Sequence, residues 1–180
     1  MEFTSKNLTF IIVTFNSKKV IFNCLNSLPK DFHKIIIENS SDQELKKELE
    51  AKYDNIEVIL NENIGMGASS NIGIKKSNSK YVFILNPDVV FKENTFFQLT
   101  EAVKKIDDFS IISPINEDSN LPNYEIKKNY QNENIDIIEV DTVDGFSMLI
   151  NKSKFNDQNY FDENFFSYLE NTDLCLRQKK

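Results

Sequence analysis

Asp88 is the residue of this chain best suited by its place in the sequence to hold a divalent cation. It follows the apolar run Tyr81 to Leu85, whose β-branched and aromatic residues predict a buried strand. The strand is expected to stop at Asn86-Pro87-Asp88, because proline lacks an N–H and fixes φ. A carboxylate at the tip of a rigid strand is the oxygen ligand that a hard cation bridging phosphates needs. Asn-Pro-Asp is also good turn chemistry, so a plain surface turn is the alternative.

Three further predicted strands also end in polar residues. In a parallel sheet such ends meet at one edge, so one crevice would collect them. A carboxylate such as Glu38 can accept the imide N–H of a uracil or thymine ring. Gly65 and Gly67, at the head of a predicted helix, allow a ribose or phosphate to approach the backbone closely. These ends are Thr14-Phe15-Asn16, Glu38-Asn39-Ser40 and Asn63-Ile64-Gly65.

An acidic cluster near the C-terminus, Glu170-Asn171-Thr172-Asp173, offers candidates for proton transfer. Glu170 and Asp173 are three residues apart and would share one face of a helix. One of them can serve as a general base toward a hydroxyl group. The alternative is that they only complement the N-terminus of that helix, where acidic residues are common.

The elements that must position these residues alternate between strand and helix. This alternation predicts an α/β fold with a largely parallel sheet flanked by helices, and one domain over residues 1–180. Ser17 is expected to cap the first helix, and Ser41 with Glu44 has the spacing of a capping box for the second. Expected strands are 8–14, 34–38, 56–60, 81–85, 111–114, 135–143 and 146–150, and expected helices are 17–28, 41–53, 65–76, 95–106, 152–155 and 171–178, with a loop at 117–133.

Composition narrows the function classes. The net charge of −7 argues against broad, sequence-independent binding of nucleic acid. A single histidine excludes a catalytic or metal site built on several imidazoles. Two cysteines are too few for a disulfide framework, and no signal peptide or membrane-spanning run is evident. Only 4 glycines occur where average usage gives roughly 13, so each is expected where a side chain cannot be tolerated.

The segment Gly65-Met66-Gly67 has a competing interpretation as a dinucleotide-binding fingerprint. That motif needs a third glycine and follows the first strand of its unit. Here Ser70 takes the third position and the segment follows the third predicted strand. The dinucleotide interpretation is therefore disfavoured, and the Gly-Lys-Ser phosphate loop is absent.

Taken together, these motifs resemble the family 2 glycosyltransferases, in particular their bacterial rhamnosyltransferase-like branch. The resemblance covers nearly the whole chain and implies a GT-A fold, a nucleotide-diphosphate-sugar donor and inversion at the anomeric carbon. The matching segments are Ile-Ile-Val-Thr-Phe-Asn-Ser (11–17), Glu-Asn-Ser-Ser-Asp (38–42), Asn-Ile-Gly-Met-Gly-Ala-Ser-Ser-Asn-Ile-Gly (63–73), Leu-Asn-Pro-Asp (85–88), Asp-Gly-Phe-Ser-Met-Leu-Ile (144–150) and the run from Phe161 to Arg177.

The resemblance implies roles for individual residues. The base and ribose would be held by strand-end residues, Asp88 would ligate Mg²⁺ or Mn²⁺ on the donor diphosphate, and residues 144–146 would lie near the acceptor sugar. Asn86 replaces the first acid of the family's D-x-D motif, leaving Asp88 as the surviving carboxylate. The donor-binding residues would be Thr14, Phe15, Asn16, Glu38, Asn63, Gly65 and Asn86.

Two departures from the family affect the expected activity. Asn171 stands where relatives carry the catalytic Asp, and an amide cannot accept the acceptor's proton. Either Glu170 or Asp173 takes that role, or the protein is slow or inactive. The sequence also stops soon after Arg177, where relatives continue toward the acceptor side, which indicates a truncated or short homologue.

The expected function is that of a metal-dependent, inverting glycosyltransferase. It would move a sugar from a UDP- or dTDP-sugar to a glycan or lipid-linked glycan in surface-polysaccharide synthesis. Its expected location is the cytoplasm at the inner face of a bacterial membrane, with peripheral membrane association and no nucleic-acid partner. The alternative is a nucleotide-sugar-binding module without turnover. A nucleotidyltransferase of related fold is less favoured, because residues 14–19 lack the glycine- and arginine-rich loop of those enzymes.

Overall fold

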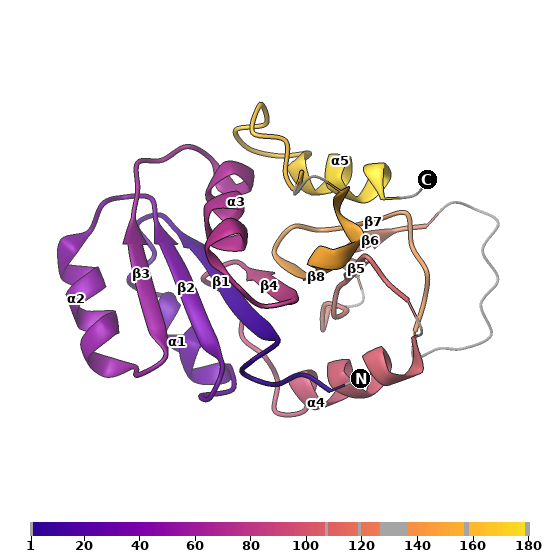
Figure 1. Ribbon diagram of the computed structural model, residues 1–180, viewed down its shortest axis with the longest axis horizontal. Coiled ribbons are helices and arrows are strands. Elements are labelled where there is room, and N and C mark those ends of the chain that lie inside the picture. The colour runs from indigo at the N-terminus through magenta and orange to yellow at the C-terminus, as the bar shows by residue number, and fades with distance from the viewer. Residues whose placement is uncertain (1, 107, 119, 127–136, 157–158, 179–180) are drawn as a thin grey trace.

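A six-stranded sheet with strand order β3-β2-β1-β4-β8-β5 organises the computed structural model (Figure 1). The structure describes residues 2–106, 108–118, 120–126, 137–156 and 159–178. Strands β3, β2, β1 and β4 are parallel, whereas β8 is antiparallel to both β4 and β5. The predicted α/β class with a mostly parallel sheet is therefore confirmed. The strands are β1 (Leu8–Thr14), β2 (His33–Glu38), β3 (Ile56–Leu60), β4 (Tyr81–Leu85), β5 (Ile111–Ile112), β6 (Tyr124–Glu125), β7 (Thr142–Val143) and β8 (Ser147–Asn151).

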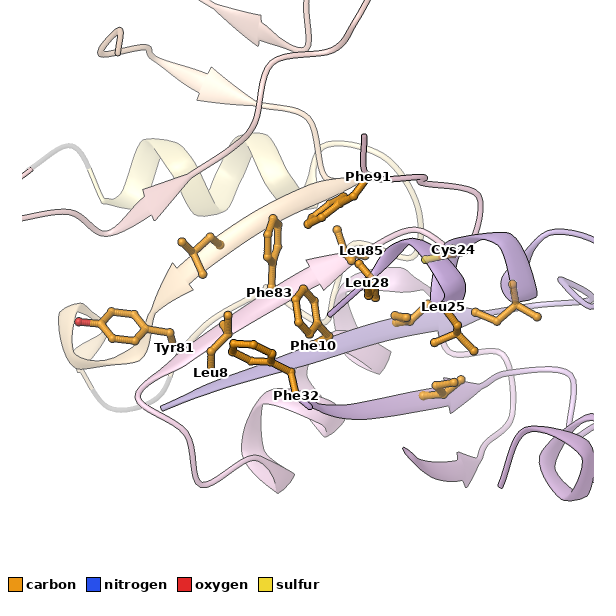
Figure 2. Packing of buried hydrophobic residues seen from close by; sticks show 14 of the residues in the cluster. Leu8, Phe10, Cys24, Leu25, Leu28, Phe32, Tyr81, Phe83, Leu85 and Phe91 are labelled. Atoms are coloured by element: carbon orange, nitrogen blue, oxygen red, sulfur yellow. The ribbon is translucent and has the colours of Figure 1, made fainter. Parts of the chain in front are cut away.

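Helices cover both faces of this sheet. Alternate residues of β1 show the two faces: Phe10 and Ile12 belong to the cluster with α1, α2 and α4, whereas Ile11 packs with α3 and α5. All seven residues of β1 are buried, as expected for a central strand covered on both sides. Figure 2 shows the first cluster, in which the rings of Phe10 and Phe83 stack with centroids 5.6 Å apart. The helices are α1 (Ile21–Ser27), α2 (Gln43–Lys52), α3 (Met66–Lys76), α4 (Thr95–Lys105) and α5 (Glu170–Arg177), with a 3-10 turn η1 (Lys152–Lys154).

The register of the parallel strands brings their carboxyl ends to one edge. Thr14 of β1 lies opposite Glu38 of β2, which lies opposite Leu60 of β3. On the other side of β1, Ile12 lies opposite Leu85 of β4. The polar segments that follow β1 to β4 therefore begin at the same edge of the sheet, as the sequence predicts.

The two predicted helix caps were wrong. Helix α1 begins at Ile21, because the Ser17 hydroxyl bonds to the backbone of Phe15 and not to a helix N–H. Helix α2 is capped by Asp42, whose Oδ1 accepts hydrogen bonds from the N–H groups of Glu44 and Leu45. Ser41 has a φ of 56° and its hydroxyl donates to the Asn61 carbonyl oxygen, so the predicted capping box does not form.

The region after α4 is less regular than predicted. Of the expected strand 135–143, residues 135 and 136 lie outside the described residues, and only Thr142–Val143 is a strand. It pairs with Tyr124–Glu125, inside the segment expected to be a loop, of which 119 and 127–133 lie outside the described residues. The pairing involves two residues on each strand. It forms a two-stranded sheet that is separate from the six-stranded one. Among the described residues, no helix is long and apolar enough to cross a membrane.

Candidate active site

The ends of β1 and β2 are joined by the carboxylate of Glu38. This side chain is fully buried, and its Oε2 accepts a hydrogen bond from the Thr14 hydroxyl at 2.8 Å. Its Oε1 accepts from the Ser40 N–H at 2.6 Å and from the Ser40 hydroxyl. Both oxygens are therefore already bonded within the chain. Because the side chain is 0% exposed, a uracil imide does not reach these oxygens in this arrangement, and Glu38 has a supporting position beneath the rim.

The exposed layer above Glu38 is formed by Phe15 and Asn16. Phe15 is half exposed although its ring is large and apolar, and Asn16 is exposed with a φ of 52°. Asparagine tolerates this left-handed conformation better than most residues, which explains its place at the turn. The N–H of Asn16 lies 3.4 Å from the Ser40 hydroxyl oxygen, to which it donates. Of the predicted donor residues at the end of β1, Phe15 and Asn16 are accessible, whereas Thr14 is buried.

An amide network that sequence reasoning missed connects this edge to α3. The Asn39 side chain exchanges hydrogen bonds with the Ser69 hydroxyl at 2.8 and 3.0 Å and accepts one from Asn61 at 3.2 Å. Strand alternation was the available signal, because it turns Asn39 to the face opposite Glu38, where α3 packs. The network fixes the ends of β2 and β3 against the helix that follows.

Asp88 lies beyond the end of β4, in the turn predicted from Asn-Pro-Asp. The turn is closed by the Val89 N–H donating to the Asn86 carbonyl oxygen at 3.2 Å, and the Asn86 N–H donates to Phe146 at 2.9 Å. Asp88 is exposed, and its carboxylate makes no hydrogen bond or ion pair with the described residues. The pKa of the Cys24 thiol in α1 is raised to about 12, mainly by burial and to a smaller extent by the negative charge of Asp88.

The chemistry of this donor set fits a weakly chelated cation. No group of three or more His, Cys, Asp or Glu side chains within the described part of the chain could enclose a metal ion. Asp88 supplies one free carboxylate at the rim, and Mg²⁺ commonly binds through one or two carboxylates together with substrate phosphates and waters. Asp88 is thus suited to a metal that arrives with a diphosphate.

At the start of α3, a later segment of the same chain packs directly against the two glycines. Gly65 has a φ of +90°, and a Cβ there would overlap the carbonyl oxygen of Phe166. The Gly65 N–H donates a hydrogen bond of 3.2 Å to the side-chain oxygen Oδ1 of Asn63, two residues earlier. A Cβ on Gly67 would lie 3.1 Å from Phe161 and 3.4 Å from Glu170. These positions are glycine because residues 161–170 pack directly on α3, a reason different from the predicted approach of a ligand.

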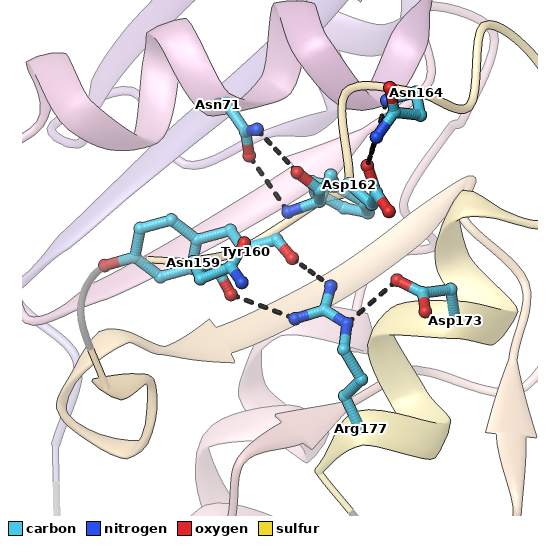
Figure 3. Close-up of polar contacts among 8 residues, drawn as sticks. Asn71, Asn159, Tyr160, Asp162, Asn164, Asp173 and Arg177 are labelled. Carbon is cyan, nitrogen blue, oxygen red and sulfur yellow. Dashed lines mark hydrogen bonds and ion pairs between the residues drawn. The ribbon is translucent and has the colours of Figure 1, made fainter.

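The three acidic-cluster residues of α5 have different surroundings. Glu170 is 7% exposed, and its Oε2 has no hydrogen-bond partner among the described residues. Asn171 donates from Nδ2 to the Val143 carbonyl oxygen at 2.8 Å. Asp173 accepts from Arg177 Nε at 2.9 Å (Figure 3). Of the two carboxylates, that of Asp173 is engaged in an ion pair, whereas that of Glu170 is buried with one oxygen unpartnered among the described residues.

Arg177 is a positioning residue that the sequence did not single out. Besides Asp173, its guanidinium bonds the carbonyl oxygens of Asn159, at 3.1 Å, and of Tyr160. It therefore ties the last helix to the segment that leads into residues 161–169 (Figure 3). The Asp173 carboxylate is therefore already paired with Arg177.

Comparison with solved structures identifies the class of fold. S. aureus TarS (residues 1–349) in complex with UDP aligns with a TM-score of 0.69 at 18% identity, covering 96% of this chain and 54% of TarS. The mannosyltransferase PcManGT from Pyrobaculum calidifontis, solved with GDP-Man and Mn²⁺, aligns with a TM-score of 0.64 at 14% identity, covering 88% of this chain and 48% of that one. The fold is the GT-A fold of nucleotide-sugar glycosyltransferases, as the sequence predicted.

The family follows from the sequence comparisons. The family model described as glycosyl transferase family 2 matches residues 9–169, so the chain belongs to that family. The low-salt glycan biosynthesis hexosyltransferase Agl10 of Haloferax volcanii is 27% identical, covering 97% of this chain and 62% of its own length. The rhamnosyltransferase WbbL of Escherichia coli K12 is also 27% identical, covering 93% and 75% respectively. The chain thus spans less than two thirds of Agl10 and about half of TarS.

Proposed function

We propose that this chain binds a nucleotide-diphosphate-sugar and transfers the sugar with inversion to a hydroxyl of a glycan or lipid-linked glycan. The observation that carries the proposal is the common edge of β1, β2 and β4, where Phe15 and Asn16 stand above buried Glu38 and where Asp88 is free. TarS has been solved with UDP and with UDP-GlcNAc, which supports a nucleotide-sugar donor. UDP- or dTDP-sugars are the proposed donors.

In the proposed mechanism, each residue acts on a defined part of the reaction. The exposed ring of Phe15 and the amide of Asn16 hold the base and ribose, supported from below by Thr14 and Glu38. Mg²⁺ or Mn²⁺, when bound, neutralises the charge that grows on the departing diphosphate, and Asp88 is its proposed protein ligand. The acceptor hydroxyl attacks the anomeric carbon opposite the diphosphate, whose C–O bond breaks, while Glu170 takes the hydroxyl proton.

The proposed setting is the assembly of a surface polysaccharide. Agl10 is named for glycan biosynthesis and WbbL for rhamnosyl transfer, and both match most of this chain. A lipid-linked acceptor would place the protein in the cytoplasm at the inner face of the membrane. Peripheral association would then be made through the acceptor, and fractionation of the protein expressed with and without its acceptor lipid tests it.

Asp88 provides the direct test of the donor site. Thermal unfolding is measured with UDP, dTDP and GDP, each with and without Mn²⁺. The melting temperature of wild type is expected to rise with UDP or dTDP, because a ligand bound only to the folded state stabilises it. The rise should be larger when Mn²⁺ is also present. Asp88→Asn should lose the Mn²⁺-dependent part, whereas Asp54→Asn, an exposed carboxylate just before β3 at the opposite edge, should keep it. Equal Mn²⁺-dependent shifts in wild type and Asp88→Asn contradict the assignment.

A second candidate function is nucleotide-sugar binding without turnover, and the geometry of Asn171 favours it. Its amide is fixed to the Val143 carbonyl, so it is a structural link between α5 and β7. In Asn171→Asp, a carboxylate would face that carbonyl, and we expect a loss of about 1–3 kcal/mol in the free energy of unfolding. Transfer that appears only in this variant would identify the natural chain as a binding module.

A further inference from the structure

Residues 162–169, hereafter the aromatic loop, expose large apolar side chains beside the candidate base. Phe166 is 60% exposed, Tyr168 82% and Leu169 61%, and Glu170 follows directly. Ile64, next to the Gly65 that contacts Phe166, is also exposed. Several large apolar side chains exposed within one short segment are a candidate binding surface. None of these side chains has a role in the donor site proposed above.

The backbone of the aromatic loop is strained where it meets α5. Tyr168 has a φ of 67° and Leu169 a φ of 71°, so two adjacent residues with side chains adopt the left-handed conformation. Neither is Gly, Asn or Asp, the residues that tolerate this conformation, so the backbone is strained at both positions. Backbone strain of this kind is typical of functional sites, where surrounding structure holds it in place.

Contacts on both sides hold the aromatic loop in this conformation. The Asn71 amide bonds both the N–H and the C=O of Phe161, at 3.0 and 2.8 Å, and also the Glu163 carboxylate at 3.0 Å. The Asp162 carboxylate accepts from the N–H and the side chain of Asn164. At the far end, Leu169 accepts the first hydrogen bond of α5 from the Asp173 N–H at 2.9 Å. The exposed rings are therefore presented by a fixed scaffold.

The charges around the loop indicate what kind of ligand it takes. Asp162, Glu163 and Glu170 lie within or beside it, Glu163 being paired with Lys75 at 3.5 Å, and the chain as a whole carries a charge of −7. An anionic membrane surface would be repelled by this arrangement. An uncharged sugar ring suits it, because the C–H face of a pyranose packs on an aromatic ring, whose face is electron-rich, while its hydroxyls can donate to carboxylates.

We infer that Phe166 and Tyr168 form an aromatic platform that holds a hexose ring of the acceptor glycan next to Glu170. This inference rests on the proposed function, because it assigns the acceptor subsite of the same reaction. The strained turn at Tyr168 and Leu169 sets the orientation of the platform relative to the carboxylate.

The absence of tryptophan from the sequence gives a direct test. Tyr168→Trp introduces a single indole into the platform, and its emission is followed with UDP and Mn²⁺ present. Methyl α-rhamnoside, methyl β-N-acetylglucosaminide and methyl α-mannoside are titrated separately. We expect at least one glycoside to shift the emission to shorter wavelength in a saturable manner, since a stacked sugar excludes water from the indole. Phe166→Trp should respond in the same way.

The matched control is Phe97→Trp, at a side chain of α4 that is 65% exposed, in a helix far from the aromatic loop (Figure 1). Its emission should not respond to any glycoside. Vesicles of phosphatidylcholine, with and without phosphatidylglycerol, should leave the Tyr168→Trp emission unchanged. Emission that responds to vesicles but to no glycoside overturns the inference in favour of a membrane contact.

Binding without a fluorophore completes the test. Glycoside affinity measured by saturation-transfer NMR should fall roughly three- to tenfold in Tyr168→Ala, the size expected for losing one aromatic contact. Phe97→Ala should leave it unchanged, and the UDP-induced thermal shift should persist in both variants. If Tyr168→Ala keeps both the UDP-induced thermal shift and the glycoside affinity of wild type, the aromatic platform is refuted, whereas the proposed donor binding stands. A wild type that shows no nucleotide-induced shift refutes the proposed function and the platform together.

Discussion

At the scale of single residues, the two carboxylates of α5 differ in how their oxygens are used. Asp173 is paired with Arg177, whereas Oε2 of Glu170 is buried without a partner among the described residues. A buried oxygen that lacks a hydrogen bond costs stability, so its retention needs an explanation. Under the mechanism proposed above, an acceptor hydroxyl that reaches this oxygen would donate a hydrogen bond to it before losing its proton.

We predict that Glu170→Gln lowers transfer or donor hydrolysis by about 100-fold or more, the usual contribution of a general base. The nucleotide-induced thermal shift should be unchanged, because the proposed donor site lies at the strand ends and not on α5. Asp173→Asn is the comparison variant. It should lose stability through the weakened Arg177 contact, yet keep activity per folded molecule. The reverse pattern, with Asp173→Asn inactive and Glu170→Gln active, would exchange the two roles.

At the scale of elements, the packing of residues 161–170 on α3 depends on Gly65. A side chain there would overlap the Phe166 carbonyl, and the φ of +90° is unfavourable for any residue with a Cβ. We predict that Gly65→Ala lowers the free energy of unfolding by about 1–3 kcal/mol and increases amide exchange across residues 162–169.

Gly145→Ala is the control for this prediction. A Cβ at position 145 would lie 3.4 Å from Asn171, which is an ordinary contact. Exchange in residues 162–169 should therefore stay as in wild type. If Gly65→Ala leaves both stability and exchange unchanged, the loop does not depend on its contact with α3.

The connection between α1 and β2 is closed by the buried ammonium of Lys34. Its Nζ donates to the carbonyl oxygens of Pro29, Lys30 and Phe32 at 2.9, 3.2 and 2.8 Å. Burial lowers the pKa of Lys34 to about 8. Below that pH, both the folded and the unfolded states carry the proton, so Lys34 adds no pH dependence to stability.

Between about pH 8 and the ordinary lysine pKa of 10.5, the unfolded state holds more protons than the folded state, so stability rises with pH. We predict that Lys34→Met is destabilised by about 1–3 kcal/mol at pH 7, because the carbonyl oxygens lose their donor. The deficit relative to wild type should grow from pH 7.5 to 9.5, as measured by urea unfolding. A deficit that shrinks over this range would contradict the lowered pKa.

At the scale of the whole molecule, one aromatic side chain joins distant segments of the core. The ring of Phe10 lies 5.6 to 6.4 Å, between centroids, from those of Phe32, Phe83, Phe91 and Phe96. These rings come from β4, α4 and the segments before β2 and after β4, so they pack only when the sheet and its helical layer are both assembled.

We predict that Phe10→Ala destabilises the protein by about 3–5 kcal/mol in a single unfolding transition, as is typical of a large cavity in a shared core. Phe97→Ala removes an exposed ring from α4 and should change stability by no more than about 0.5 kcal/mol. Urea unfolding followed by far-UV and near-UV circular dichroism measures both. Two separate transitions in Phe10→Ala would show that the segments fold independently.

Local information in the sequence was enough to define the central strands. The bounds of β1, β3 and β4 are those predicted, because each is a short apolar run rich in β-branched or aromatic residues and bounded by polar ones. The helix starts at Ser17 and Ser41 failed, because several nearby side chains can serve as caps and only the three-dimensional turn selects one. The residues at the strand ends were also predicted, because parallel strands share the direction of their carboxyl ends.

By itself, the sequence determined the α/β class, the family and the polar rim, since each depends on short-range patterns and on motif order. Only the tertiary structure decided that Glu38 lies buried beneath the rim, that the open side of Gly65 is filled by Phe166, and that Arg177 occupies Asp173 and leaves Glu170 free. These are contacts between segments far apart in the chain or turned toward each other by local geometry. Residue type and spacing do not specify them, because burial and hydrogen-bond partners depend on how all the elements pack together.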